Sequence, residues 1–448
     1  MTESVKANLT RGNETRLLIK LTIPMVFGML SMVFYNLVDT FYVGQLGKDQ
    51  LAALSFTFPV VMVIGSIALG IGIGTSSLVS RALGQRDEIK TRRYATDSLI
   101  LGFLLVMVVI VLGLFTLRPL FTLLGARGVI LDHVEEYMRI WYPGMVFVVI
   151  PMIANNTLRA TGDSKNPGLI MVAGAVTNFI LDPFLIFGIA FFPRLEIRGA
   201  ALATVFARLI TFGLSLSIVT RKKLLSFRIR RLSVLLESWK EILYIGIPNA
   251  LIKSLIPLGM GVITGLIARF GPGAVAAYGV VSRIEFFALA TVNALSSITG
   301  PFVGQNWGAR RYSRVIKGYH AGEKLALGIG AFFAVFLFLF SRPVAALFSS
   351  HPAIIDYIAL FLKIAPFAYC FQGLMLITGA ALNAINRPYH ATSLVLMEMF
   401  VLYIPLSLLL SQWLQATGIF IALAVAYSFT GGMAHLMFHR TFRRSHPR

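Results

Sequence analysis

The hydrophobic pattern of the chain consists of long apolar runs separated by short polar segments. A helix that crosses the hydrocarbon core of a bilayer needs about 20 predominantly apolar residues. Twelve runs of that kind occur along the sequence: 17–43, 51–79, 94–117, 134–154, 168–192, 199–219, 242–268, 275–298, 319–340, 354–377, 391–410 and 417–437. The pattern therefore predicts an all-α integral membrane protein with twelve transmembrane helices.

The character of these runs excludes other classes of protein. They are continuous rather than alternating, which favours helices over the strands of a membrane barrel. With 13% charged residues, the chain has too little charge to cover the surface of a soluble protein of 448 residues. The first run is too long for the apolar part of a cleavable signal peptide. The single cysteine, Cys370, excludes a disulfide within the chain.

Several landmarks recur at a constant offset of 224 residues, which indicates an internal duplication. They fall at expected helix ends and kinks, and they pair Ile23-Pro24 with Ile247-Pro248, Gly47 with Gly271, Gly84 with Gly308, and Arg118-Pro119 with Arg342-Pro343. Each half contains six runs, so both halves enter the membrane from the same side. We expect an N-lobe (1–220), a basic cytoplasmic linker (221–240) and a C-lobe (241–448), with a cleft between the two lobes.

The net charge of +21 is explained by topology rather than by nucleic-acid binding. Most of the 40 Lys and Arg residues fall in the N-terminal tail, the even-numbered loops and the C-terminal tail. Cytoplasmic loops carry such an excess of positive charge. We therefore expect a multi-pass protein of the inner (plasma) membrane with both termini in the cytoplasm, in contact with anionic lipid headgroups.

Two acidic residues stand inside predicted spans, where ionisable groups are costly and suggest function. They are Asp39 in 17–43 and Asp182 in 168–192. Both lie in the outer halves of spans that run in the same direction, so they can meet at similar depth. Asn178 precedes Asp182 by four residues and Tyr35 precedes Asp39 by four, so each shares a helix face with its acid. Tyr137 enters at similar depth from 134–154.

Such a group suits reversible binding of a cation. A carboxyl group in a low dielectric binds a proton more readily than in water. Asp39, Asn178 and Asp182 together could also hold Na⁺ through oxygen ligands. The structural alternative is that each Asp ends a helix or packs against a neighbouring donor. Pro24 interrupts the first span some four turns before Asp39, where it permits a kink and makes this position a candidate hinge.

The acids are not repeated in the second half, where Ile263 and Leu406 stand at the equivalent positions. Ionisable residues do occur in the spans there, and their roles stay open at this stage: Lys253, Arg283, Glu285, Lys363 and Glu398. Lys253 lies well inside its span. If it lines the cleft, it argues against a purely cationic substrate.

Motifs for other chemistry are absent from the sequence. There is no GxxxxGK[ST] phosphate-binding loop, no HExxH, no CxxC and no paired acidic motif for a Mg²⁺-bound diphosphate. We therefore expect a secondary transporter driven by an ion gradient rather than an enzyme or an ATP-driven pump. No cofactor is expected, and a monomer suffices for a two-lobe cleft.

Several segments together resemble the multidrug and toxic compound extrusion (MATE) family of cation-coupled exporters. They are IPMVFGMLSMVFYNLVDTFYVGQLG (23–47), SRALGQRD (80–87), NNTLRATGDSKNP (155–167), NFILDP (178–183), GIPNAL (246–251), VSRIEFF (281–287) and VGQNWGA (303–309). The chain is most similar to the DinF-like branch, whose N-lobe holds paired aspartates. The resemblance implies extrusion of hydrophobic, often cationic compounds in exchange for H⁺ or Na⁺.

By the same resemblance, Asp39 and Asp182 are the coupling carboxylates with Asn178 beside them. Tyr35, Tyr137 and Asn155 then line the substrate cavity of the N-lobe, and Pro24 matches the bending proline of that branch. Other branches carry acids in the seventh and tenth spans, where Lys253 and Lys363 stand here, so no cation site of that kind is expected in the C-lobe.

A threonine sometimes found in the family's sixth-span network is replaced here. Ala200 stands at the corresponding place and Thr204 lies one turn on, which weakens a Na⁺ site more than an H⁺ site. The alternative function is a flippase for lipid or lipid-linked oligosaccharide, which Lys253 favours and twelve spans disfavour. A membrane-embedded enzyme would need clustered catalytic groups at one membrane face, and the sequence shows none.

Overall fold

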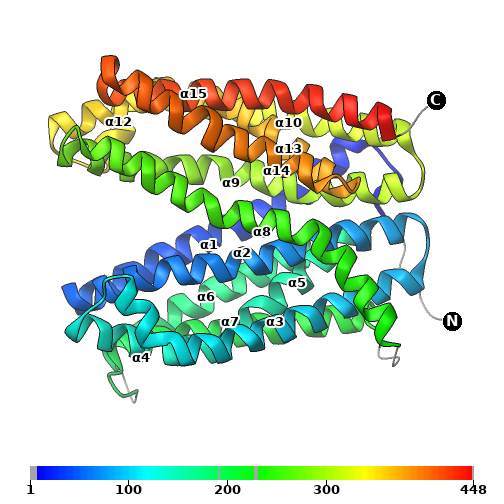
Figure 1. Cartoon of the computed structure of the whole chain (residues 1–448), viewed down its shortest axis with the longest axis horizontal. Helices are drawn as coiled ribbons and strands as arrows, with labels where there is room; N and C mark the ends of the chain where they lie inside the picture. Colours follow the sequence, from blue (N-terminus) through cyan, green and yellow to red (C-terminus); the bar gives the residue numbers. More distant parts are fainter. Residues whose placement is uncertain (1–7, 190–191, 227–230, 446–448) are drawn as a thin grey trace. The chain divides into compact units, whose positions relative to one another are not determined.

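A computed structural model of the chain describes residues 8–189, 192–226 and 231–445, and within these ranges it is helical almost throughout and contains no strand (Figure 1). The all-α membrane fold predicted from the apolar runs is confirmed. The helices are α1 (Glu14–Leu46), α2 (Lys48–Gly84), α3 (Glu88–Leu123), α4 (Gly128–Gly144), α5 (Val146–Ala160), α6 (Lys165–Phe187), α7 (Glu196–Arg221), α8 (Leu232–Ala268), α9 (Pro272–Gly308), α10 (Tyr312–Leu339), α11 (Ser341–Ala346), α12 (Pro352–Ile364), α13 (Tyr369–Ala384), α14 (Pro388–Leu396) and α15 (Ile404–Ser445).

Three short segments complete the described elements. One 3₁₀ turn precedes α1 at Asn8–Thr10, and a second joins α12 to α13 at Ala365–Ala368. A π-helical segment, Met397–Tyr403, joins α14 to α15. A π-helical turn inside a helix is rare and is frequently found at functional sites.

Ten stretches of the described chain are long and apolar enough to cross a membrane, and an eleventh is formed by α4 and α5, which are bent by 44° relative to each other. The stretch from Pro388 to Arg444 covers two of the predicted runs. Inside it the backbone leaves the helical region at Gln415 (φ 51°, ψ −138°), between the runs 391–410 and 417–437. Divided at Gln415, the described helices account for all twelve predicted spans.

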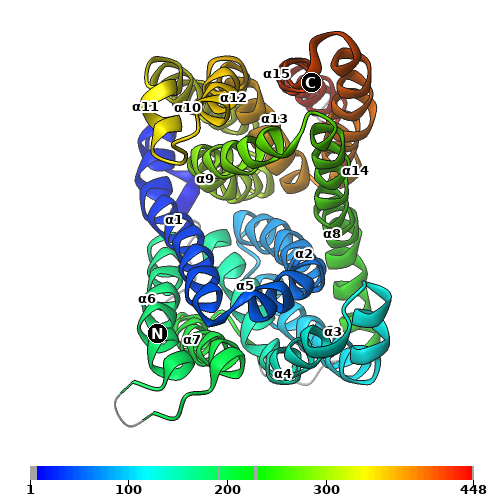
Figure 2. The same ribbon diagram turned by 90° about the vertical axis from the view of Figure 1, so that its left-hand side faces the viewer.

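The chain folds into two compact units. Of the described residues, those from 23 to 250 belong to the first unit, and residues 9–22 with 251–445 to the second. In Figure 2 the helices of each unit are seen nearly end-on as a bundle. The division crosses α1 between Thr22 and Ile23 and crosses α8 between Ala250 and Leu251. Each crossing lies within two residues of a proline, and Pro24 and Pro248 are equivalent positions of the duplication.

The first turns of α8 belong to the first unit, in the region where the sequence suggested a linker (221–240). Trp239 Nε1 donates to the Asp97 carbonyl oxygen (2.9 Å), and the Tyr94 hydroxyl donates to Glu241 (2.7 Å). Ile242 is buried in the apolar core of the first unit. The contacts of Trp239 and Glu241 hold this part of α8 against α3, and α8 begins ten residues before the predicted run. Residues 227–230 of the linker lie outside the described residues.

The start of the chain also differs from the expected N-lobe. Residues 9–22 pack with the second unit instead. The Leu9 N–H donates to Gln305 Oε1 (3.0 Å), and Asn306 Nδ2 donates to the Leu9 carbonyl oxygen (3.1 Å). Arg314 pairs with Glu14 at 2.8 Å, and both side chains are largely buried. An apolar run cannot reveal such partners, because they lie almost 300 residues away.

Glycines let α2 approach α8 within the first unit. A Cβ at Gly70 would lie 2.4 Å from the Gly246 carbonyl oxygen, and one at Gly74 would lie 2.4 Å from the Ile242 carbonyl oxygen. Such small residues allow the backbones of membrane helices to touch. The glycine-rich stretch of α2 is therefore explained by helix packing.

We expect Gly74→Ala to lower the thermal stability of the purified protein by about 1–3 kcal/mol, because the new methyl group meets backbone atoms that cannot move alone. Gly65→Ala is the matched control on the same helix, because a Cβ there meets nothing within 4 Å. Thermal unfolding in detergent measures both variants. Equal melting temperatures for the two would contradict this account of the contact.

An ion pair joins the α5–α6 loop to the end of α7. Lys222 Nζ lies 2.6 Å from Asp163 Oδ2, and the backbone N–H of Asn166 donates to Asp163 Oδ1 (3.1 Å). Burial alone would raise the pKa of the Asp163 carboxyl. The bonds from Lys222 and Asn166 outweigh it and hold that pKa below its usual value of 3.8.

Because the folded-state pKa is lowered, the stabilisation is complete above the usual pKa and is lost as the pH falls through the folded value. Lys222→Ala should lower the stability at neutral pH by at most about 1 kcal/mol, since water screens the pair. The difference from the wild type should shrink at acid pH. Melting temperatures across pH, with Lys223→Ala as control, test this, and a pH-independent difference would argue against the ion pair as its cause.

Candidate functional site

Aromatic contacts place the C-terminal halves of α1 and α6 side by side in the first unit. The rings of Phe34 and Phe179 are 6.1 Å apart, and those of Tyr42 and Phe187 are also 6.1 Å apart. Along each helix these rings bracket an acid, Asp39 on α1 and Asp182 on α6. The packing therefore sets the two carboxyl groups at the same level, as the sequence predicted.

Asp182 is fully buried and has one direct partner on its own helix. Asn178, also fully buried, donates from Nδ2 to Asp182 Oδ1 (3.0 Å). Asp39 is buried to 9% exposure and lies close enough to Asp182 for the two carboxyl groups to interact electrostatically. The two acids and the amide thus form one group, here called the carboxylate cluster (Asp39, Asn178 and Asp182).

Two tyrosines and a threonine lie beside the carboxylate cluster. The Tyr35 and Thr204 hydroxyl groups are 3.1 Å apart, and Tyr137 also hydrogen bonds to Thr204. Both tyrosines are within electrostatic range of Asp39 and Asp182. Ala200 stands where the family sometimes has a threonine. Thr204, one turn further along α7, supplies a threonine hydroxyl to the site instead.

Arg208 is a member of this site that the sequence reasoning missed. Its guanidinium carbon lies 5.0 Å from the centre of the Tyr35 ring, and its charge acts on Asp39. A signal was available, because Arg208 is one turn after Thr204 inside a predicted span. A lone arginine in a span is often a side chain that reaches to the membrane surface, and only the fold shows that this one faces a carboxyl group.

Three oxygen atoms of the carboxylate cluster are buried without a hydrogen-bond partner in the described part of the chain. They are Asp39 Oδ1, Asn178 Oδ1 and Asp182 Oδ2. A buried polar atom without a partner costs free energy. All three are acceptors, so protons or a cation would satisfy them, whereas an anion would not.

The remaining two predicted residues lie apart from the cluster. Asn155 on α5 is buried and accepts a long hydrogen bond from Ser215 of α7 (3.4 Å), and its described contacts do not include Asp39 or Asp182. Pro24 lies on α1, about 22 Å along the helix from Asp39 at 1.5 Å per residue. Its carbonyl oxygen abuts Gly168 of α6, where a Cβ would lie 2.4 Å away.

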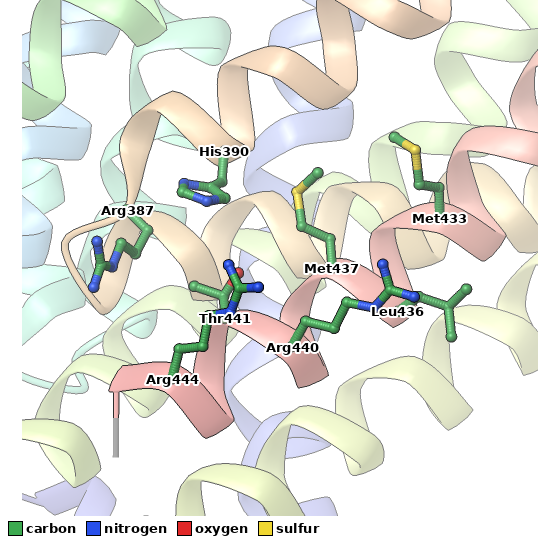
Figure 3. Close-up of a pocket in the computed structure, with 8 residues that line it drawn as sticks. All are labelled: Arg387, His390, Met433, Leu436, Met437, Arg440, Thr441 and Arg444. Atoms are coloured by element: carbon green, nitrogen blue, oxygen red, sulfur yellow. The ribbon is translucent and has the colours of Figure 1, made fainter. Parts of the chain in front are cut away.

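A pocket in the second unit collects basic rather than acidic side chains. Arg387 and His390 line one wall, at the start of α14, and the end of α15 lines the other (Figure 3). Arg440 and Arg444 lie towards the end of α15, while Met433, Leu436 and Met437 lie one to three turns earlier. The pocket thus combines positive charge with an apolar surface.

The chemistry open to the carboxylate cluster is the reversible binding of positive charge. No group of three or more His, Cys, Asp or Glu side chains in the described ranges is arranged to hold a metal ion. The cluster contains two carboxyl groups and one amide oxygen, fewer ligands than hard cations usually take from proteins. Protons need only the two carboxyl groups.

Comparisons with known proteins agree with this description. The family model described as MatE matches residues 24–184 and 248–409. The chain is 37% identical over 420 residues to a protein of Shewanella oneidensis named as an FAD transporter, covering 93% of this chain and 92% of that one. It is 27% identical over 424 residues to the multidrug export protein MepA of Staphylococcus aureus, covering 93% and 91%. The fold matches the crystal structure of the Vibrio cholerae MATE transporter VcmN in the bent form, with a TM-score of 0.91, 29% identity and coverage of 96% and 97%.

Proposed function

Because the chain belongs to the MATE family of membrane transporters, we propose that it is a secondary active multidrug exporter that extrudes hydrophobic or cationic organic compounds in exchange for protons. The observation that carries the proposal is the carboxylate cluster with its three unpartnered acceptor oxygens. Multidrug export by relatives such as MepA supports the substrate class.

The charges of Asp39, Asp182 and Arg208 determine how many protons the site can bind and release. Two ionised carboxyl groups and the Arg208 guanidinium leave one negative charge uncompensated inside the bundle. Two carboxylates in one low-dielectric site repel each other and hold a shared proton. One proton neutralises the cluster and Arg208 taken together, and its release restores a negative site. A cationic substrate that binds beside Tyr35 and Tyr137 would then replace that proton, which is the exchange that antiport requires.

Protons fit this site better than Na⁺ does. Arg208 already supplies a fixed positive charge near Asp39, and a second cation beside it would be repelled. Na⁺ bound at Asp39, Asn178 and Asp182 is the alternative coupling ion, and it would use the same three unpartnered oxygens.

Pro24 is proposed as the hinge of this exporter. It lies where α1 passes from the second unit to the first, and a proline removes one hydrogen bond from the helix. We place the exporter in the plasma membrane with both termini in the cytoplasm, following the positive-inside pattern. On that side the basic pocket at Arg440 and Arg444 would contact anionic lipid headgroups.

The test uses proteoliposomes loaded with a fluorescent lipophilic cation, with a pH gradient and a Na⁺ gradient imposed separately. We expect the pH gradient alone to drive transport, and Asp39→Asn to slow it by at least about tenfold because the proton site is lost. Asp356→Asn is the control, because Asp356 is exposed and pairs with Arg342. Transport by Asp39→Asn at the wild-type rate would refute the coupling role, and dependence on Na⁺ alone would replace the proton with Na⁺.

A second candidate substrate is FAD, favoured by the 37% identity to a named FAD transporter over nearly the full length of both chains. FAD combines a flat aromatic ring system with an anionic diphosphate. An anionic substrate needs a cationic partner in the protein. Lys253, which lies on an exposed face of α8 within a predicted span, can supply one.

If FAD is exported, Lys253→Ala should reduce its transport by roughly tenfold through loss of a charge-assisted contact, while transport of the lipophilic cation is kept. Lys363→Ala is the matched control, because Lys363 is another exposed lysine on a helix of the same unit. Radiolabelled FAD in the same proteoliposomes provides the measurement. Absence of FAD transport by the wild type, or equal effects of the two lysine variants, would exclude this candidate.

A further inference from the structure

The second unit contains a buried polar group that the proposed coupling site does not use. Glu285 on α9 and Glu398 on the π-helical segment are both buried, with 8% exposure each. They are close enough to interact electrostatically, and Lys253 of α8 acts on Glu398. Four tyrosine side chains lie within electrostatic range of Glu285, and they come from α9, α13, the π-helical segment and α15: Tyr278, Tyr369, Tyr403 and Tyr427.

The hydrogen bonds of Glu398 indicate which form of this carboxyl group the site accommodates. Gln372 Nε2 donates to Glu398 Oε1 (3.1 Å), and Thr430 Oγ1 lies 3.0 Å from Glu398 Oε2. The same Thr430 hydroxyl lies 2.7 Å from the Ala426 carbonyl oxygen. A hydroxyl group has one hydrogen, and a backbone carbonyl can only accept. Thr430 therefore cannot make a full hydrogen bond to a Glu398 carboxylate without weakening its bond to Ala426.

Every one of these contacts is satisfied when Glu398 carries a proton. The Glu398 O–H then donates to Thr430 Oγ1, Thr430 donates to the Ala426 carbonyl, and Gln372 donates to the remaining carboxyl oxygen. Loss of the proton leaves two acceptors competing for one hydrogen in a buried site. The ammonium group of Lys253 is the nearby charge that can compensate the carboxylate.

Two further buried atoms show that the group is not a closed structural network. Gln372 Oε1 and the Tyr369 hydroxyl have no hydrogen-bond partner in the described ranges, and these side chains are only 7% and 1% exposed. Gln372 is directed into the site by its bond to Glu398. An acceptor without a donor, next to a carboxyl group, would be satisfied by a proton-bearing species.

We propose that the second unit holds a proton-binding site of its own, in which Glu398 takes up one proton from water to become a carboxylic acid and returns it as a carboxylate. Glu285, held by the Tyr427 hydroxyl (2.8 Å), lies within range to sense that change of charge. That this proton moves during transport rests on the proposed antiport, whereas its binding does not.

Infrared spectroscopy of the protein in proteoliposomes tests the proposal without a transport assay. A protonated carboxyl group gives a C=O band that shifts in D₂O. We expect one such band to be lost in Glu398→Gln and to titrate with pH in the wild type. Glu323→Gln is the matched control, because Glu323 is also buried in the same unit and each of its carboxyl oxygens has an imidazole partner, His320 (3.0 Å) and His435 (2.7 Å). Persistence of every band in Glu398→Gln would overturn the proposal.

A second variant distinguishes a proton donor from a proton acceptor at Glu398. Thr430→Val keeps the shape of the side chain and removes the hydroxyl. If protonated Glu398 donates to Thr430, the variant loses proton affinity by roughly tenfold, which is one pH unit downward in the titration of the band. If Thr430 instead donates to a carboxylate, the titration moves upward, and the assignment is wrong.

Transport then separates this site from the carboxylate cluster. If Asp39→Asn exports normally while the Glu398 band behaves as expected, the proposed coupling at Asp39 fails and the second proton site stands. If Asp39→Asn is inactive and Glu398→Gln changes no band, the coupling role of Asp39 stands and the second site is refuted.

Discussion

The rest of this structure depends on one constraint, which is that a polar or charged side chain inside a membrane-spanning bundle must find its partners within the protein. Asn178 supplies an amide to Asp182, Arg208 acts on Asp39, and Gln372 supplies an amide to Glu398. At these acids the partners fall short for acceptor atoms, which are Asp39 Oδ1, Asn178 Oδ1, Asp182 Oδ2 and Gln372 Oε1. A shortage of donors at a buried acid is the condition in which binding a proton is favourable.

The duplication preserves the packing of the two halves and not their chemistry. Asp39 and Asp182 correspond to Ile263 and Leu406, while Glu398 corresponds to Gly174, which packs against Thr211. A helix scaffold tolerates such exchanges, because the apolar face that packs against its neighbours is separate from the few polar positions. The acids of the two proposed sites therefore stand at different positions, on α1 and α6 in the first unit and on α9 and the π-helical segment, which is equivalent to part of α6, in the second.

The sequence alone was sufficient for the spans and for the meeting of Asp39 with Asp182, because both follow from apolar length and helix periodicity. It was insufficient wherever a partner came from a distant segment. Arg208 became part of the site only because α7 packs beside α1, and Thr204 only because Tyr35 and Tyr137 point at it. The early start of α8 and the placement of Leu9 beside Gln305 likewise depend on contacts across more than a hundred residues. Lys253 and Lys363, in the seventh and tenth spans, led us to expect no cation site in the C-lobe. The buried acids Glu285 and Glu398 lie on other helices of that half.

The position of the two prolines connects the acids to the division between units. α1 and α8 are equivalent helices of the duplication, each belongs to both units, and each changes unit within two residues of its proline. A helix that lacks a hydrogen bond at that point bends at low cost. Asp39 stands on the same helix as Pro24, and the Pro24 carbonyl packs against Gly168 of the helix that carries Asp182. In the proposed exporter, a change of charge between Asp39 and Asp182 would therefore act on both helices that form the contact at Pro24, and we propose that protonation and bending of α1 are coupled through this helix pair.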